Sequence, residues 1–488
     1  MNEMSTEINP MAKKWRKGLR RIALVYPNRY VGGISNIGIQ YIYHRINSMD
    51  DFICERFYTD VFNGIRSVES GAYLKDFDIA LFSIQYEEDA FNAYEIIKRS
   101  GFKGLKVAGG PCIMENPLPY SFFDLMFTGE LEGSNFIDEV LLGKEPAGKG
   151  TYIPGKTERV ERVYSELDSH LQTQIIGDGA YGRALLLEIG RGCYRNCRFC
   201  IVRQIYAPCR WRKKEILLEV AEKHRKVVDK VALIAPSPSD HPQFREIIFE
   251  LAEMGFSVSP SSIRADKLDE EILEFLANLG LKTLTFAPEA GSGRLRRVIS
   301  KGISKDDIIN ASIMASESGI EKIKLYFMIG LPGENMDDIR AITDMVEEVR
   351  RYVRRVEVSI NPLVPKPHTP FQWLAFGGGE GFNKAVVKEI KSKMKYLLSS
   401  FRKKGVESKP FSVEEFAVQT VLSRGGKDVA LLIEKGKERA FRNIFHLGLD
   451  SYLDSMIDRE LPWMIVDHGY DIKRLEKEFG RAMKVAHS

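Results

Sequence analysis

The 488-residue sequence has few cysteines, no long hydrophobic run and a net charge of only +4. Sparse cysteine, half of it in one cluster, argues against a disulfide framework and for a metal site in a reducing compartment. No apolar run approaches the roughly 20 residues of a membrane-spanning helix, and residues 1–21 lack the apolar core of a signal peptide. We therefore expect a cytoplasmic protein that does not enter a membrane. The small charge permits an anionic partner without requiring one.

The sequence contains 44% hydrophobic and 28% charged residues. This composition is typical of a globular protein that can form a large hydrophobic core. At about 150 residues per domain the length predicts roughly three domains. Turn-rich and polar stretches separate the segments that we expect: a flexible leader at 1–20, an α/β domain at 21–147, a connector at 148–181, a second α/β domain at 182–375 and a mostly helical region at 376–488.

The first α/β domain alternates buried strands with helical segments, which predicts a doubly wound parallel sheet. Ligands of such sheets bind beyond the carboxyl ends of the strands. The loops expected there contain glycine or polar residues, although glycine turns alone are weak evidence for a ligand. The candidates that they supply are Asn28, Gly109, Gly110, Gly129 and Glu130. The strands are expected at 21–27, 53–58, 78–83, 105–108 and 125–127.

The second α/β domain contains six strand–helix units, enough for a partial or full barrel whose chemistry collects at the carboxyl ends of its strands. Apolar runs bounded by polar turns predict the strands, and helical periodicity fills the segments between them. These strands are expected at 184–187, 231–235, 257–260, 283–287, 322–328 and 356–361.

The first strand of this domain leads directly into Cys193, Cys197 and Cys200, spaced C-x3-C-x2-C. Three thiolates on one loop can hold a [4Fe–4S] cluster through three irons and leave the fourth iron open. Zinc is the competing interpretation, but closed zinc sites normally take four protein ligands. The flanking histidines, His170 and His224, are distant in sequence. Cys209 is the remaining candidate for a fourth ligand.

This cysteine motif, with Phe199 before its last cysteine, resembles the signature of radical S-adenosylmethionine (SAM) enzymes. The resemblance continues in 261–266, 286–292, 330–334 and 364–371. It implies that the open iron binds the amino and carboxylate groups of SAM, which reduction splits into methionine and a 5′-deoxyadenosyl radical. It further implies SAM-binding roles for Ser262, Arg264 and Glu289. It assigns no catalytic residue on the polypeptide.

One segment departs from the family pattern. The Gly-Gly-Glu of the family's second strand is replaced here by residues 235–239, Ala-Pro-Ser-Pro-Ser. The SAM amino group must therefore be held differently, and Ser237 and Ser239 are our candidates.

The first domain resembles the cobalamin-binding, Rossmann-like domain that precedes the radical SAM (β/α)6 barrel in one subgroup. The resemblance rests on domain order and on residues 107–111 and 127–130. The D-x-H-x-x-G motif that supplies a cobalt ligand in other cobalamin proteins is missing. The only histidine before residue 150 is His44, and Asn47 stands where that motif has glycine. Bound cobalamin would then lack a histidine ligand from this domain.

The resemblance implies a cobalamin-dependent radical SAM C-methyltransferase that activates an sp3 carbon and methylates it from methylcobalamin. A protein substrate and an electron donor such as ferredoxin or flavodoxin would be its partners. One alternative is a radical SAM enzyme of another reaction type, in RNA modification or cofactor biosynthesis. Methylthiolation of tRNA would need three cysteines in the first domain, which has only Cys54 and Cys112. Another alternative is a non-catalytic protein that binds cobalamin or SAM.

The stretch 388–404 is strongly basic. We interpret it as a solvated helix face in preference to a surface for nucleic acid.

Overall fold

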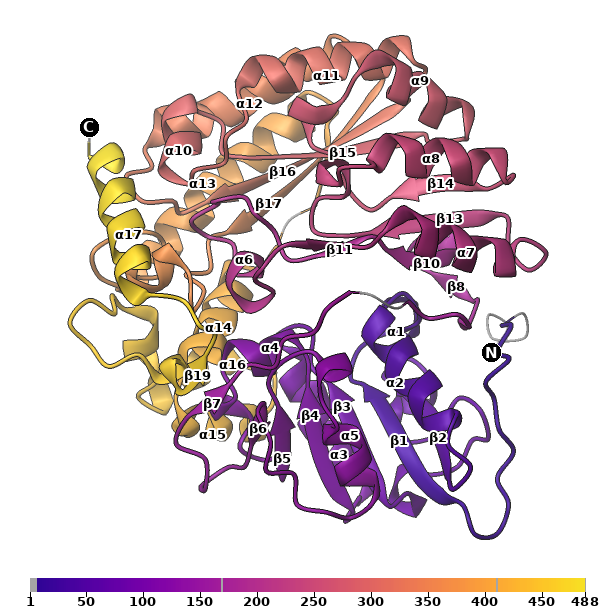
Figure 1. Ribbon diagram of the computed structural model, residues 1–488. Helices are drawn as coiled ribbons and strands as arrows, with labels where there is room; N and C mark the ends of the chain where they lie inside the picture. Colours follow the sequence, from indigo (N-terminus) through magenta and orange to yellow (C-terminus); the bar gives the residue numbers. More distant parts are fainter. Residues whose placement is uncertain (1–6, 168–169, 410, 488) are drawn as a thin grey trace.

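A computed structural model describes residues 7–167, 170–409 and 411–487. The N-terminal α/β unit lies below a second α/β unit in the view of Figure 1, and the C-terminal helices run along one side of both. None of the helices in these ranges combines the length and the apolar composition that crossing a membrane requires.

The N-terminal unit is built on a six-stranded sheet of order β2-β1-β3-β4-β5-β6, in which only the edge strand β6 is antiparallel. Its apolar strands are buried on both faces because helices cover both sides. The predicted doubly wound sheet is confirmed, and its strand order reverses between β1 and β3, where such sheets bind ligands. The strands are β1 (Arg20–Tyr26), β2 (Phe52–Tyr58), β3 (Ile79–Ser83), β4 (Leu105–Gly109), β5 (Leu125–Phe127) and β6 (Thr151–Tyr152); the helices are α1 (Tyr30–Ile34), α2 (Ile37–Asn47), α3 (Asp89–Ser100), α4 (Pro111–Glu115) and α5 (Phe136–Leu141).

The second unit is a partial barrel whose parallel strands form two hydrogen-bonded sheets, β10-β13-β14 and β15-β16-β17-β18. All six predicted strands form, with ends within two residues of those expected from the sequence. They are β10 (Leu185–Glu188), β13 (Lys230–Ile234), β14 (Ser257–Pro260), β15 (Thr283–Glu289), β16 (Lys322–Ile329) and β17 (Arg355–Pro362). The surrounding helices are α7 (Lys214–His224), α8 (Phe244–Glu253), α9 (Glu270–Asn278), α10 (Gly293–Val298), α11 (Lys305–Glu317) and α12 (Met336–Arg350).

The barrel continues past residue 376, where the sequence predicts a mostly helical region. Helix α13 (Lys384–Lys403) leads into β18 (Glu407–Lys409), which pairs in parallel with β17 and adds a seventh strand. This strand is only three residues long and polar, so hydrophobic patterning gives no signal for it. The basic residues of 388–404 lie on or just after α13, where Lys393 pairs with Glu334 at 3.0 Å and Lys391 and Lys404 pair with Glu414 and Glu347.

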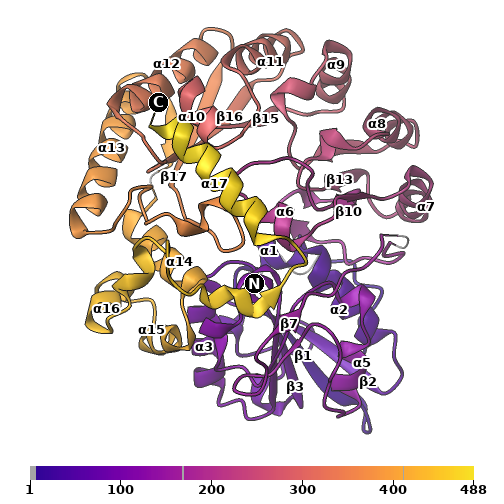
Figure 2. The same ribbon diagram turned by 60° about the vertical axis from the view of Figure 1, so that its left-hand side comes forward.

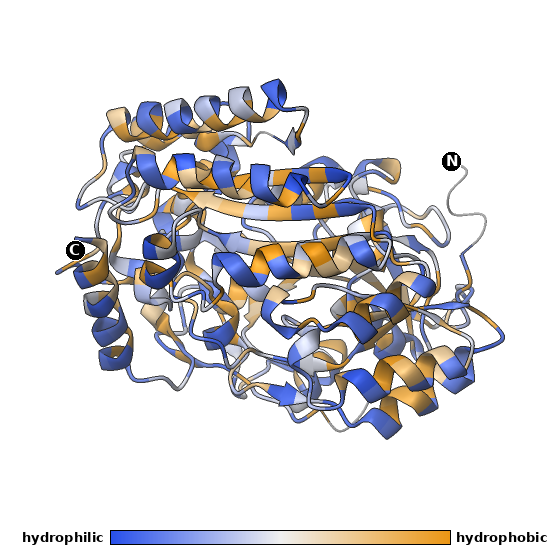
Figure 3. Ribbon diagram, turned by 90° about the horizontal axis from the view of Figure 1, so that it is seen from above, coloured by the Kyte–Doolittle hydropathy of each residue, from blue (hydrophilic) through white to orange (hydrophobic). Residues whose placement is uncertain are grey.

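Burial alternates along the strands β15 and β16. Leu325 and Phe327 are buried beneath the helices, whereas Tyr326 between them is 38% exposed. Figure 3 shows the outer helices with hydrophilic residues outward and hydrophobic residues toward the strands. The apolar core therefore lies between helices and strands, and the inner face of the barrel is polar and accessible.

The remaining C-terminal segments hold the two units together. Strand β19 (Val466–Asp467) pairs with β7 (Val160–Glu161) of the connector. Helix α17 (Ile472–Ala486) packs against α10 of the barrel (Figure 2). The other helices here are α14 (Val413–Arg424), α15 (Ala430–Lys435), which packs against α3, and α16 (Ala440–His446).

The described part of the expected leader makes specific contacts. Ile8 forms a backbone bridge with Ile176 in the connector. The carboxylate of Glu7 accepts a hydrogen bond of 2.5 Å from Arg56, a fully buried side chain of β2. A buried guanidinium needs such an anionic partner, so this end of the leader belongs to the fold.

Candidate active site

The cysteine loop begins at the carboxyl end of β10 and is closed at its base by two short antiparallel strands, β11 (Gly190–Arg191) and β12 (Arg210–Trp211). Gly192 adopts a positive φ of +79°, and a Cβ there would lie 2.4 Å from the carbonyl oxygen of Tyr206. Only glycine fits this close approach. The loop ends in the short helix α6 (Val202–Ile205).

Arginine side chains fix the backbone of the loop. The guanidinium of Arg203 donates to the carbonyl oxygens of Tyr194 (3.0 Å) and Arg195 (2.9 Å). The Arg195 side chain in turn donates to Asp240 at 3.0 Å. The loop conformation is thus held by protein contacts as well as by any metal that it binds.

The three thiols line one cavity of about 280 Å3. Burial raises the pKa of Cys200 to about 12, and burial also raises the pKa values of Cys193 and Cys197. Thiolates in such surroundings require a cation beside them, which a bound metal supplies. The described residues that line this cavity include no histidine and no fourth cysteine, so the donor set fits a cluster with one open iron better than a closed zinc site.

Four of the five SAM candidates line the same cavity: Ser262, Arg264, Glu289 and Ser237. The fifth, Ser239, is not among the lining residues; its hydroxyl accepts a hydrogen bond of 3.2 Å from the backbone N–H of Arg264. The Ser237 hydroxyl is buried beside the Asp240 carboxylate and makes no hydrogen bond of regular geometry in the described part of the chain. An unpaired buried hydroxyl is costly, and a bound polar ligand would satisfy it.

Glu289 has an unusual backbone at the end of β15. Its φ is +66°, a strained value for a residue with a side chain, and the register between β15 and β16 shifts just before it. Burial raises the pKa of its carboxyl group, against which Lys301 lies at 3.0 Å. Lys301 also lines the cavity, and neither spacing nor motif identifies it in the sequence.

A second cavity, of about 440 Å3, lies between the N-terminal unit and the barrel. Gly109, Gly110, Gly129 and Glu130, all predicted from the sequence, line it. Asn28 does not, because its side chain donates to Asp89 at 2.7 Å. The barrel side supplies further lining residues, among them Glu188 and Arg191, and Leu24 and Leu81 belong to the apolar floor.

Glu130 also belongs to a buried ion network that joins the two units. Its carboxylate accepts two hydrogen bonds from Arg210, at 2.6 and 2.8 Å, and lies 3.3 Å from Arg191. Arg191 binds Glu188 and Glu132 as well, each at 2.8 Å. Bidentate pairs of this kind fix orientation, so the rim of the cavity is rigid.

The two cavities are neighbours. Val202 of α6 and Pro236, which follows β13, line both of them. A molecule at the cysteine loop and another between the units would therefore be separated by about one layer of side chains.

Comparison with known proteins agrees with this geometry. The model of the radical SAM superfamily matches residues 187–346, and that of the N-terminal region of radical SAM proteins matches residues 38–151. An uncharacterised protein of Methanocaldococcus jannaschii is 37% identical over 454 residues, which cover 91% of this chain and 97% of the relative. A putative methylthiotransferase of the same organism is 26% identical over 335 residues, which cover 62% of this chain and 71% of that protein.

Two solved structures share the fold. The radical SAM methyltransferase TsrM of Kitasatospora setae, solved with tryptophan and a SAM analogue, superposes with a TM-score of 0.51 at 15% identity and covers 72% of this chain and 75% of its own. The cobalamin-dependent SAM radical enzyme OxsB, in its apo form, also has a TM-score of 0.51, at 14% identity over 96% of this chain and 79% of its own. From the cysteine loop, the matching family model and the relative that is similar along nearly its full length, we conclude that this chain belongs to the radical SAM superfamily of enzymes, whose members use a [4Fe–4S] cluster and SAM.

Proposed function

We propose that this enzyme is a cobalamin-dependent radical SAM C-methyltransferase. The observation that carries the proposal is the contact between the two cavities at Val202 and Pro236. The radical derived from SAM and the methyl group of cobalamin must both reach the same acceptor carbon, so the two cofactor sites have to lie close together. Domain order and the fold shared with TsrM and OxsB support the same assignment.

When bound, the cluster with SAM would supply the radical that activates the acceptor carbon, and cobalamin would supply the methyl group. The protein's own contribution is binding and orientation. In this proposal Cys193, Cys197 and Cys200 hold three irons. Ser262 and Arg264 hold SAM, and the unpaired Ser237 hydroxyl takes over from the missing Gly-Gly-Glu.

The cavity between the units has the character that a corrinoid needs. Its floor is apolar while its rim is polar. Gly110, with φ +107°, brings the backbone close to Ile84, and a Cβ there would lie 2.5 Å from the Ile84 carbonyl oxygen. No histidine is among the described lining residues, as expected if cobalt has no histidine ligand from this domain.

We extend the proposal to a protein side chain as the acceptor, namely a glutamine of methyl-coenzyme M reductase. Domain order supports this, and so does the polar, accessible inner face of the barrel around Tyr326. An electron donor such as ferredoxin or flavodoxin, and a cytoplasmic location, complete the proposal. Transfer of the label from methyl-deuterated SAM to the glutamine-containing peptide, read by mass, tests the acceptor. An unlabelled peptide in an otherwise active reaction would exclude it.

The cobalamin site is tested by anaerobic reconstitution with iron and sulfide, addition of hydroxocobalamin, gel filtration and an absorbance spectrum. The wild type should retain one corrinoid per chain. Gly110→Ala should retain the cluster and lose the corrinoid, because the new methyl group moves the loop. Gly101→Ala is the matched control, since Gly101 also has positive φ (+66°) but open space around it. A wild type that holds the cluster and no corrinoid would reduce the proposal to a plain radical SAM enzyme.

Methylthiolation is the rival chemistry, and the putative methylthiotransferase relative gives it support. The second cluster of that chemistry needs three cysteines in the first domain, whereas Cys54 lies on β2 and Cys112 on α4, both buried. Reconstituted protein should therefore contain one [4Fe–4S] cluster, with about four cluster irons. About eight irons would favour methylthiolation. A cluster that never forms 5′-deoxyadenosine from SAM would favour the non-catalytic alternative.

A further inference from the structure

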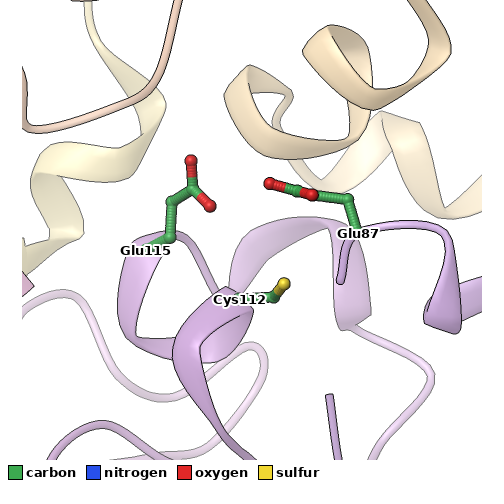
Figure 4. A group of neighbouring side chains, drawn as sticks. All are labelled: Glu87, Cys112 and Glu115. Atoms are coloured by element: carbon green, nitrogen blue, oxygen red, sulfur yellow. The ribbon is translucent and has the colours of Figure 1, made fainter. Parts of the chain in front are cut away.

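A buried group of metal-ligating side chains lies away from the cysteine loop, where the N-terminal unit meets the barrel and α14. Cys112 and Glu115 are three residues apart on α4 and so share one face of that helix, and Glu87 follows β3. Figure 4 shows the two carboxylates facing one another with the Cys112 thiol beside them. One ligand atom from each of the three lies within 4.8 Å of the others, and the residues are 2–4% exposed.

Two partners occupy some of these oxygens and leave others open. The ammonium of Lys366 contacts one oxygen of Glu87 and lies 3.3 Å from Oε2 of Glu115. The Gln419 amide donates to Oε2 of Glu87 at 2.7 Å. Oε1 of Glu115 remains buried with no partner in the described chain.

Tyr120 lies against the same group. It is 1% exposed, and its hydroxyl interacts with the Cys112 thiol. Oε1 of Glu115 is thus the atom of this group left without a partner in the described chain, and a dry interior rarely leaves such a polar atom unused.

The charges of the group suit one divalent cation. Burial raises the pKa values of Glu115 and Cys112 well above their ordinary range and lowers the pKa of Lys366 to about 7, so burial alone favours the neutral forms. As metal ligands, two carboxylates and a thiolate would carry three negative charges, and a protonated Lys366 would carry one positive charge. A divalent ion brings the sum to zero, which matters because a buried net charge is strongly unfavourable. Sulfur together with carboxylate oxygen suits zinc or ferrous iron, whereas magnesium and calcium prefer ligand sets of oxygen alone.

We propose that Glu87, Cys112 and Glu115 bind one divalent transition-metal ion, zinc or ferrous iron, with Lys366 balancing the remaining charge. The ion would hold α4 through Cys112 and Glu115. Pro111 and Met114 of the same helix line the interdomain cavity, so the ion would stabilise the cavity wall. Two buried histidines already hold the end of α4 by its carbonyl oxygens, His368 at Glu115 (2.8 Å) and His468 at Met114 (2.9 Å). The site is thus a support for the cavity wall and does not depend on the chemistry at the cysteine loop.

Cobalt(II) is the probe, because a thiolate bound to it gives a charge-transfer absorption in the near ultraviolet. The full chain with Cys193, Cys197 and Cys200 replaced by serine removes the cluster's iron and thiolates. This protein should bind one cobalt per chain and develop the thiolate absorption. The same background with Cys112→Ser should lose it, and Glu115→Gln should weaken cobalt binding by about tenfold or more.

Cys54→Ser is the matched control, because Cys54 is an equally buried thiol of the same N-terminal unit, and it should leave the absorption unchanged. Metal content of the reconstituted wild type provides a second measurement that needs no variant at the cluster. After addition of zinc and gel filtration, it should hold one zinc beside the cluster iron, and zinc should raise its midpoint of thermal unfolding. Absence of both bound zinc and an iron beyond those of the cluster, or a cobalt absorption that persists in Cys112→Ser, would overturn the proposal.

Discussion

The two cavities are built in opposite ways. The cavity at the cysteine loop takes its three thiols from eight consecutive residues and its other polar groups from the ends of neighbouring strands. The cavity between the units takes its walls from many separate segments, from Leu24 to Pro236. A local motif thus creates the first site, whereas only the docking of two α/β units creates the second. The first should survive changes at the domain interface, and the second should survive loss of the cysteines.

The sharpest test of this independence is replacement of Cys193, Cys197 and Cys200 by alanine. We expect loss of all cluster iron and of all 5′-deoxyadenosine formation, because no remaining thiolate can take their place. Corrinoid retention should be unchanged. Iron analysis and chromatography of SAM products measure the first effect, and a corrinoid spectrum measures the second. SAM cleavage by this variant would mean that the loop has been assigned wrongly.

The interdomain cavity should instead respond to Arg210→Met. The change leaves the Glu130 carboxylate buried without its bidentate partner, which should lower the free energy of unfolding by about 3–5 kcal/mol. Denaturant unfolding measures it. Lys156→Met removes an ion pair whose partners are both more than two-thirds exposed, and it should change stability by at most about 1 kcal/mol. Equal effects of the two changes would contradict the importance of the buried network.

Low pH should lower the free energy of unfolding through His170, which contacts the end of strand β10. His170 accepts a hydrogen bond of 3.0 Å from the backbone N–H of Glu188, and burial, with Arg212 nearby, lowers the pKa of His170 to about 4. Because the folded pKa lies below the ordinary value of about 6.5, the unfolded chain takes up the proton first as pH falls. His170 alone should therefore lower stability by about 2 kcal/mol between pH 6.5 and pH 5, in addition to the effect of His368, whose pKa burial also lowers to about 4.

The pH effect is checked by denaturant unfolding at several pH values. His170→Gln should flatten the slope, whereas the exposed His446→Gln should keep it. The assignment to His170 fails if both variants retain the wild-type slope.

The smallest effects are expected for Ser237→Ala, which should raise the stability of the free protein and lower its affinity for SAM. Alanine removes a buried hydroxyl without a partner, so the free protein should become more stable by up to about 1 kcal/mol. SAM binding should weaken by about fivefold, which is about 1 kcal/mol, because one hydrogen bond is lost. Equilibrium binding of SAM to the reconstituted protein and thermal unfolding measure the two effects. Ser239→Ala, outside the cavity lining, should leave SAM affinity nearly unchanged; if it weakens SAM more than Ser237→Ala does, the assignment of Ser237 is wrong.

The features that could be predicted from the sequence are those that depend on residues close together in the chain. Hydrophobic runs located the six barrel strands, and cysteine spacing located the loop, because both signals are local. The contacts of Lys301 with Glu289 and of Arg210 with Glu130 join residues that are distant in the sequence, and no periodic pattern predicts them. Asn28 shows the same limit, since its loop was located correctly while its side chain turned toward Asp89.

The interruption of strand pairing between β14 and β15 bears on how the barrel responds to an occupant. The cavity with the cysteines lies along this seam, with Ser262 and Arg264 following β14 on one side and Thr285 and Glu289 of β15 on the other. No ladder of hydrogen bonds sets the width of the seam. A molecule that fills the cavity would contact both sides of the seam, so its size would influence how far apart the two halves of the barrel stand.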